Sequence, residues 1–156
     1  MIGRLALLLC VVPLASCKPD SNSALLEEKS PAGLDQGVAI VKSNKTTHRF
    51  TVEIARSDKE QAYGLMNRQS LGQNRGMIFP YDPPQAVSFW MRETFIPLDL
   101  VFVAPGGKIA RIEESAVPLS LEPIPSGEEV EAVLEIAGGR ASELGIAPGD
   151  RIDWPH

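Results

Sequence analysis

Between Phe89 and Asp99 the sequence places several side chains that could recognise a small molecule within eleven residues. The indole of Trp90 can stack on a sugar or peptide group, and the guanidinium of Arg92 can hold a carboxylate or a phosphate. Thr94 can fix a backbone turn through its hydroxyl group. The stretch therefore predicts a binding patch, whose members are Trp90, Arg92, Glu93, Thr94 and Asp99.

The same stretch has two other interpretations. Glu93 and Asp99 are the best pair for general acid–base chemistry, so a carboxylate-dependent hydrolase of a glycan is the alternative function. In a purely structural arrangement, Trp90 packs in the core, Arg92 pairs with one of the two carboxylates, and Thr94 caps a turn. The sequence favours a non-catalytic binding domain and leans away from an enzyme.

Other catalytic chemistries lack the residues that they need. His48 and His156 are isolated and have no spacing typical of a metal site. Ser88, Ser115 and Ser120 lack a nucleophile-elbow context, and only His48 could serve one of them as a base. We therefore predict no metal, no cofactor and no serine nucleophile.

The N-terminus predicts export. Leu5–Leu14 is an apolar run of ten residues after a short basic segment, which suits a signal peptide and is too short to span a bilayer. The run ends in Leu14-Ala15-Ser16-Cys17, which resembles the lipobox of bacterial lipoproteins. The sequence thus predicts a signal peptide over 1–16, lipidation at Cys17, and membrane anchoring on the periplasmic or extracellular face of the cell envelope.

Composition narrows the range of partners. Removal of Cys10 and lipidation of Cys17 would leave the folded domain without a thiol, which excludes disulfides and cysteine nucleophiles. The net charge of −5 argues against nucleic acid, because phosphate binding needs clustered cations. We expect a neutral or zwitterionic ligand from the envelope, such as a glycan or a neighbouring protein.

These candidate residues need elements to position them. Residues 17–37 lack a sustained period and predict a flexible tether, and residues 38–154 predict one globular domain. Alternating or apolar runs predict strands, and a capping box at Ser57 and Glu60 predicts a helix to about Met66. The expected strands are 38–41, 48–55, 77–79, 86–91, 98–103, 108–112, 130–136 and 151–154, with a second short helix over 138–144.

Turn residues organise this order. Asp82-Pro83-Pro84 predicts a break between two strands, and Ala104-Pro105-Gly106-Gly107 predicts a hairpin. Residues 117–129 contain three prolines and predict a long surface loop. Leu98–Val103 is apolar on both faces, so we expect it to be the central strand. The fold class expected is α+β and β-dominated: a compact barrel-like or rolled, mostly antiparallel sheet with two short helices.

Several ordered motifs carry a family resemblance. They are Gly64-Leu65-Met66-x-Arg68, Gly76-Met77-Ile78-Phe79, Phe89-Trp90-Met91, Thr94, Ile96-Pro97-Leu98-Asp99, Leu134-Glu135, Gly138-Gly139 and Gly145-Ile146-x-x-Gly149-Asp150. With these motifs the chain resembles the bacterial and archaeal family of domain of unknown function 192, over roughly residues 38 to 153. The resemblance implies a small β-barrel or α+β domain and implies no particular activity.

The chain departs from that family at one point. Members usually carry Met-Lys-Asn-Thr where this sequence has Met91-Arg92-Glu93-Thr94. Arg92 keeps the positive charge, whereas Glu93 replaces an amide with a carboxylate. Asp150, after Gly149, is expected to bond nearby backbone N–H groups in a turn before the last strand.

Overall fold

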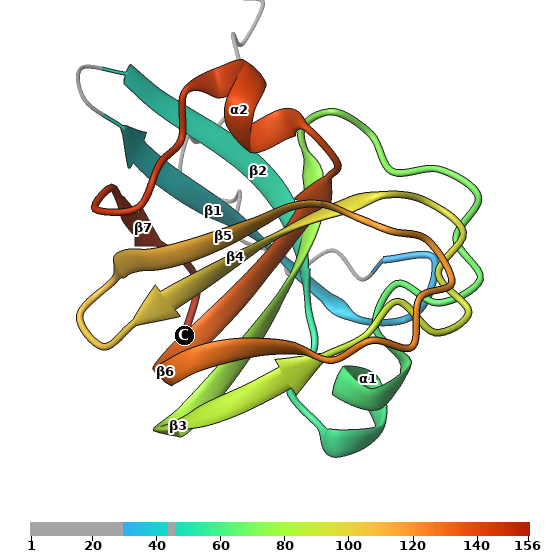
Figure 1. Cartoon of the computed structure of the whole chain (residues 1–156). Helices are drawn as coiled ribbons and strands as arrows, with labels where there is room; N and C mark the ends of the chain where they lie inside the picture. The colour runs from blue at the N-terminus through green and yellow to red at the C-terminus, as the bar shows by residue number, and fades with distance from the viewer. Residues whose placement is uncertain (1–29, 44–45) are drawn as a thin grey trace, which may run out of the picture.

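The computed structural model describes residues 30–43 and 46–156 of the chain. The predicted signal peptide (1–16), Cys17 and much of the predicted tether lie outside these residues. The described part contains seven strands and two short helices (Figure 1). In chain order they are β1 (Asp35–Ser43), β2 (Thr46–Ile54), α1 (Asp58–Tyr63), β3 (Arg75–Phe89), β4 (Leu98–Ala104), β5 (Lys108–Ala116), β6 (Ile124–Ala137), α2 (Arg140–Leu144) and β7 (Arg151–Asp153).

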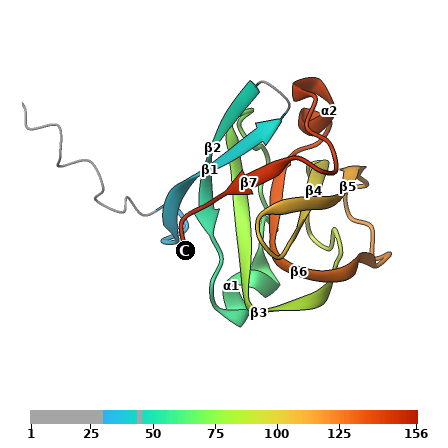
Figure 2. The same ribbon diagram turned by 90° about the vertical axis from the view of Figure 1, so that its left-hand side faces the viewer.

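The strands close into a barrel in the order β1-β2-β3-β6-β4-β5-β7, because β7 pairs with both β5 and β1. Neighbouring strands are antiparallel except β2 and β3, which run parallel. A parallel pair needs a crossover connection, and α1 lies within it. Figure 2 shows β7 running alongside β1. The predicted β-dominated α+β class, with a mostly antiparallel sheet and two short helices, is confirmed.

The barrel interior is one apolar cluster to which all seven strands contribute. Phe50, Val52 and Ile54 of β2 are almost completely buried there, as their alternation with polar residues predicts. Ala141 of α2 and Trp154 belong to the same cluster.

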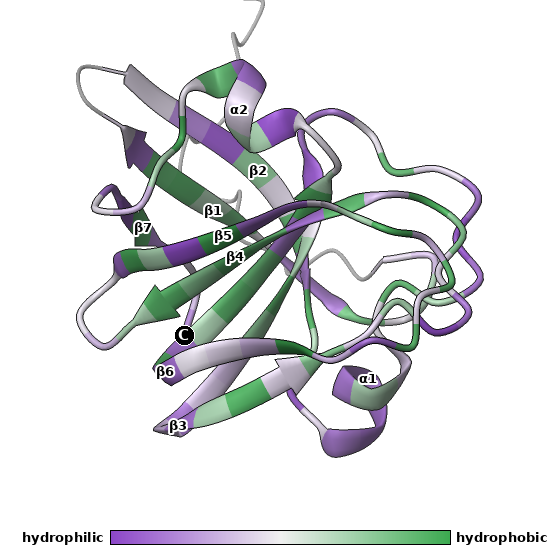
Figure 3. Ribbon diagram, in the orientation of Figure 1, coloured by the Kyte–Doolittle hydropathy of each residue, from purple (hydrophilic) through white to green (hydrophobic). Residues whose placement is uncertain are grey.

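β4 is the central strand, as predicted. Every residue from Leu98 to Val103 is buried, and β4 pairs with β5 on one side and β6 on the other. Figure 3 shows hydrophobic colour along most of this strand. Its residues alternate between the barrel interior (Val101 and Val103) and the outer face of the sheet.

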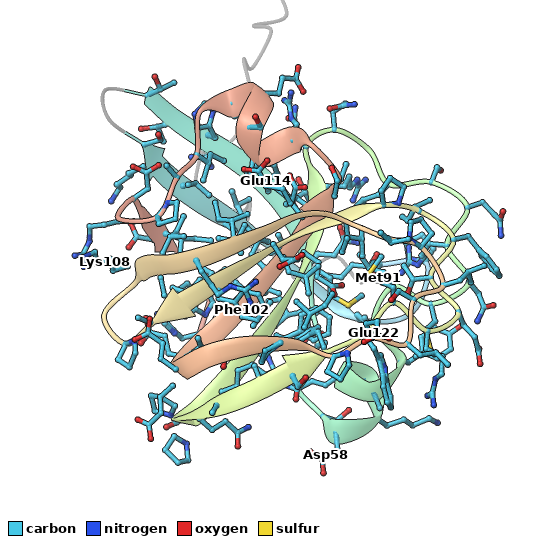
Figure 4. The ribbon with its side chains drawn as sticks, viewed as in Figure 1. Asp58, Met91, Phe102, Lys108, Glu114 and Glu122 are labelled. Carbon is cyan, nitrogen blue, oxygen red and sulfur yellow. The ribbon has the colours of Figure 1, made fainter. Side chains whose placement is uncertain are left out.

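The outer face of β3, β4 and β6 supports a second apolar cluster. The residues that project from these strands are Phe79, Leu100, Phe102 and Val133. Met91, in the loop between β3 and β4, packs against them. Figure 4 labels Met91 and Phe102, two members of this outer layer. The domain therefore has two cores, one inside the barrel and one outside it.

The second half of β3 and the first half of β6 cover much of this outer layer. Their register shifts between Pro80 and Gln85, and Figure 1 shows both strands turning back sharply at this point. The fold-back brings Phe89 edge-on to Phe79, with ring centroids 5.1 Å apart, and edge-on to Phe102 at 6.2 Å.

Two sequence predictions are wrong at this fold-back. Residues 77–79 and 86–89 are parts of one strand, β3, which ends at Phe89 before the end of the predicted run 86–91. The predicted loop 117–129 ends early because β6 begins at Ile124. Ser88 pairs with Pro125 and Phe89 with Ile124, so the β3–β6 ladder continues past the prolines. Long-range pairing outweighs the local signal of the prolines, which the register shift accommodates.

The capping box that starts α1 is confirmed. The Ser57 hydroxyl accepts from the Glu60 N–H at 3.3 Å, and the Glu60 carboxylate accepts from the Ser57 N–H at 2.8 Å. The helix ends at Tyr63 and not near Met66, because the next residue, Gly64, takes a positive φ of 50°. The chain then turns under the fold-back of β3.

Candidate functional site

A cavity of about 340 Å³ opens between the two halves of β3. Its lining comes from the end of α1 and the turn after it, from both halves of β3, from the loop after β3, and from β6. The lining residues are Gln61, Ala62, Tyr63, Gly64, Leu65, Met66, Phe79, Tyr81, Gln85, Ala86, Val87, Ser88, Phe89, Trp90, Thr94 and Glu135. This volume lies within the range of small-molecule sites in proteins.

Aromatic rings form much of the wall of this cavity. Phe79 is buried and Phe89 is partly buried, in the edge-on arrangement described above, whereas the Trp90 side chain is 50% exposed. The Arg92 guanidinium lies over the Trp90 ring, 4.6 Å from its centroid. The guanidinium of Arg92 therefore covers part of the indole, and half of the Trp90 side chain remains accessible to solvent.

Glu135 is the unexpected member of the lining. It lies on β6 between Met77 of β3 and Leu100 of β4, neither of which is exposed. Glu135 itself is only 5% exposed, and its buried Oε2 has no hydrogen-bond partner among the described residues. Burial in these apolar surroundings raises the pKa of its carboxyl group to about 8.

Tyr81 shares this environment. Burial raises the pKa of its phenol well above the usual value, and the nearby Glu135 raises it further. The phenol therefore stays protonated at physiological pH and keeps both donor and acceptor capacity. The cavity thus combines apolar rings with a phenol and one carboxyl group that lacks a partner.

The predicted patch is divided by the structure. Trp90 and Thr94 line the cavity with Glu135, whereas Arg92 and Glu93 line a second, more open hollow of about 620 Å³ beside α1. Thr94 is buried and its hydroxyl donates to the Arg92 carbonyl at 3.2 Å, so it fixes the turn as the sequence indicated. Arg92 stacks on Trp90 and forms no ion pair with Glu93 or Asp99 in the described part of the chain.

Glu93 takes the left-handed backbone conformation, with φ of 53°. Its carbonyl accepts from the Asn67 N–H at 2.8 Å, which joins this loop to the turn after α1. Asn tolerates positive φ better than Glu does, so the Asn usual in the family suits the backbone here. The departure at Glu93 thus bears on loop conformation, independently of any amide donor.

Asp99 lies apart from the patch. It is completely buried, and its carboxylate accepts from the backbone N–H groups of Ser115, Gly139 and Ala141 at 2.7–2.8 Å. Both oxygens are used in joining β4 to the end of β5 and to the start of α2. Because these bonds occupy the carboxylate, Glu93 and Asp99 do not form a pair that faces a substrate.

Asp150 has the local role that its position indicates, since its carboxylate accepts from the Ala147 N–H at 2.9 Å. Across residues 30–43 and 46–156, no group of three or more His, Cys, Asp or Glu side chains is placed to hold a metal ion. In the same residues, no helix has the length and hydropathy needed to cross a membrane.

Sequence reasoning missed Glu135 as a site residue. The alternation of 130–136 placed it on the face of the strand opposite the core, where a carboxylate is expected to meet water. The signal against this was the neighbourhood Val133-Leu134-Glu135-Ile136, which is apolar on both faces of the strand and typical of a buried position. A single carboxylate inside such a run is expensive to bury, and that cost points to a site.

The fold and this cavity define a small closed barrel domain with a ligand-sized site on its outer layer. The family model of domain of unknown function 192, described as "Uncharacterized ACR", matches residues 39–154, and the chain belongs to that family.

Two solved structures are similar to this chain. A protein of unknown function from Novosphingobium aromaticivorans DSM 12444 is 43% identical, with a TM-score of 0.81 over 84% of this chain and 94% of that one. A proposed transcription regulator from Sinorhizobium meliloti 1021 is 36% identical, with a TM-score of 0.76 over 78% of this chain and 95% of that one. The comparison with curated proteins finds no match.

Proposed function

We propose that this protein is a non-catalytic binding domain whose ligand is a neutral or zwitterionic component of the cell envelope. The observation that carries the proposal is the cavity of about 340 Å³ with the half-exposed Trp90 at its mouth. Exposed indoles beside apolar cavities are common at sites that hold sugars and peptides, because the ring offers a large contact surface at small entropic cost.

The proposed location follows from the N-terminal sequence. The protein is exported, loses residues 1–16 and is anchored to a membrane through lipid on Cys17, with the domain on the periplasmic or extracellular side. Labelling cells with a fatty acid analogue tests this, since label should enter the wild-type protein and be lost in Cys17→Ala. Equal labelling of the two proteins would contradict the anchor while leaving the cavity untouched.

The binding proposal is tested with peptidoglycan fragments and tryptophan fluorescence. The titrated protein carries Trp154→Phe, so that the signal reports Trp90 alone. We expect a saturable change in this protein. Because replacing Trp90 as well would leave no tryptophan to report binding, calorimetry is used for the Trp90→Ala control and should show weaker binding of the same fragments. If no envelope fraction produces a saturable change, the proposal loses its support.

Two other activities lack comparable support. A hydrolase based on Glu93 and Asp99 needs two accessible carboxylates, and Asp99 is buried with three backbone donors. Regulation of transcription through direct contact with DNA is opposed by the net charge of −5, because like charges repel the phosphate backbone.

A further inference from the structure

We infer that Glu135 is the specificity-determining residue of the cavity and that it selects ligands carrying a protonated primary amine. This inference rests on the proposed binding function, because it names the chemical group that the same cavity takes. The amine would donate to the partnerless Oε2 of Glu135 while the rest of the ligand lies against Phe79, Phe89 and Trp90.

The carboxyl group of Glu135 has no counter-charge among the residues that line the cavity. Besides Glu135, the only acids or bases among the described residues that line the cavity are the phenols of Tyr63 and Tyr81. None of these lining residues is Lys, Arg or His. A buried carboxyl group is normally paired or hydrogen-bonded, so its missing partner must come from outside the protein.

The surroundings of Glu135 Oε2 favour a primary ammonium group. A primary ammonium supplies N–H donors and a positive charge, whereas a quaternary ammonium has no N–H to donate. Aromatic faces attract cations, and Phe79, Tyr81, Phe89 and Trp90 all contribute to the wall. An anionic group would instead meet the carboxyl group and the electron-rich rings, and both disfavour it.

Binding of an ammonium group at Glu135 is coupled to the loss of a proton from its carboxyl group. The elements around Glu135 are β3, which contributes Tyr81 and Met77, β4, which contributes Leu100, and the end of α1, which contributes Tyr63. None of these neighbours is a cation, and the pKa of Glu135 is about 8. The free cavity therefore holds a proton at pH below about 8, and the binding of an ammonium must release it.

The experiment uses the full chain in a non-ionic detergent and three probes of one shape: benzylamine, benzyl alcohol and benzoate. Titration calorimetry at about pH 8 should show benzylamine binding about 10–100-fold more tightly than benzyl alcohol, with benzoate weakest. Between about pH 6 and pH 7, the benzylamine affinity should rise close to tenfold. At about pH 6 to 7, buffers of different ionisation enthalpy should report close to one proton released per ligand, and at about pH 8 they should report about half a proton.

The decisive variant is Glu135→Gln, which keeps the shape of the side chain and removes its charge. It should bind benzylamine and benzyl alcohol equally and release no proton. Glu129→Gln is the matched control, because Glu129 is an exposed carboxylate on the same strand. This substitution should leave the affinity for benzylamine and the number of protons released unchanged. If Glu135→Gln does not fold, the pH profile and proton count of the wild type decide alone.

The outcomes separate this inference from the proposed function. Equal affinity for the three probes, or a preference for benzyl alcohol without proton release, would overturn the role of Glu135 and leave a binding cavity in place. Failure of every probe, together with failure of the peptidoglycan titration, would remove both proposals.

Discussion

Asp99 shows how one side chain can fasten three segments of backbone. Its carboxylate accepts from N–H groups at the end of β5, just before α2, and within α2. α2 has only five residues and its N-cap, Gly139, has no side chain to cap it. The carboxylate of Asp99 takes that place and also complements the positive end of the helix dipole.

Replacing Asp99 by Ala should therefore lower the free energy of unfolding by about 3–5 kcal/mol, because three donors lose their acceptor in a buried place. Urea unfolding followed by circular dichroism measures the change. Glu114→Ala is the control, since Glu114 is exposed and should alter stability by less than about 0.5 kcal/mol. A loss below about 1 kcal/mol in Asp99→Ala would mean that these bonds contribute little.

Glu135 should give the stability of the protein a pH dependence of its own. Burial raises its pKa from 4.5 to about 8, so between these values the folded state keeps a proton that the unfolded chain releases. The stability contributed by this group is therefore complete below about pH 4.5 and is lost as the pH rises to about 8.

Glu135→Gln removes that loss. Relative to the wild type, we expect the variant to gain about 2–4 kcal/mol in free energy of unfolding between about pH 5 and pH 8. Urea unfolding of both proteins at the two pH values measures the difference. The prediction is wrong if the gap between the two proteins stays constant across this range.

The site residues differ in whether the groups that they contact lie near them or far from them in the sequence. Trp90 and Thr94 line the cavity, and the sequence indicates both because an aromatic ring and a turn-forming hydroxyl act where they stand in the sequence. Asp99 was misassigned because its three partners come from β5 and the α2 region, which no local pattern connects to β4. Glu135 was missed because its burial depends on a second layer that forms only when β3 and β6 turn back.

At the scale of elements, β4 contributes residues to both apolar cores, one inside the barrel and one outside it. Phe102 is completely buried on the outer face, edge-on to Phe89 and beneath the Arg111 guanidinium, which lies 4.8 Å from the ring centroid. Phe102→Ala should cost about 3–5 kcal/mol in thermal or urea unfolding, through lost burial and the cavity left behind.

Phe95→Ala is the matched comparison for that substitution. Phe95 is 46% exposed in the loop before β4, so its loss should cost less than about 1 kcal/mol. Similar losses in the two variants would show that the outer layer is not packed as tightly as the ring contacts of Phe102 indicate.

The elements that the sequence predicts correctly are those with strong local signals. The alternation of 48–55, the apolar run of 98–103, the hairpin at 104–107 and the capping box of α1 all appear in the structure. The elements that it misplaces are held by distant pairing: the second half of β3 and the first part of β6 stabilise each other across their prolines. The sequence predicts 86–91 as a separate strand, whereas residues 124–129 have no convincing strand pattern alone.

At the scale of the whole molecule, closure of the barrel depends on one tight approach. A side chain at Gly107 would place its Cβ 2.7 Å from the Ile152 carbonyl of β7, and Gly107 has a positive φ of 80°. The Ile152 N–H also donates to the Gly107 carbonyl at 2.8 Å. The hairpin between β4 and β5 thus closes the ring against the last strand.

Gly107→Ala should destabilise the protein by about 2–4 kcal/mol, from backbone strain and from the contact with β7. Its neighbour supplies the control: Gly106 has a similar φ of 86° but open space around the new Cβ, so Gly106→Ala should cost only about 1 kcal/mol. Hydrogen exchange of the β7 amides should rise in Gly107→Ala alone. Equal effects of the two substitutions would show that the approach to β7 is not important for closure.

The separation of the two cores has an evolutionary consequence. The interior core holds the barrel together, whereas the residues that shape the cavity project from the outer face or from segments that cross over it. Substitutions in Gln85–Trp90 can therefore change which molecule fits without disturbing the interior packing on which folding depends. Relatives that share this barrel are free to diverge in what they bind, so agreement in overall shape is a poor guide to a shared ligand.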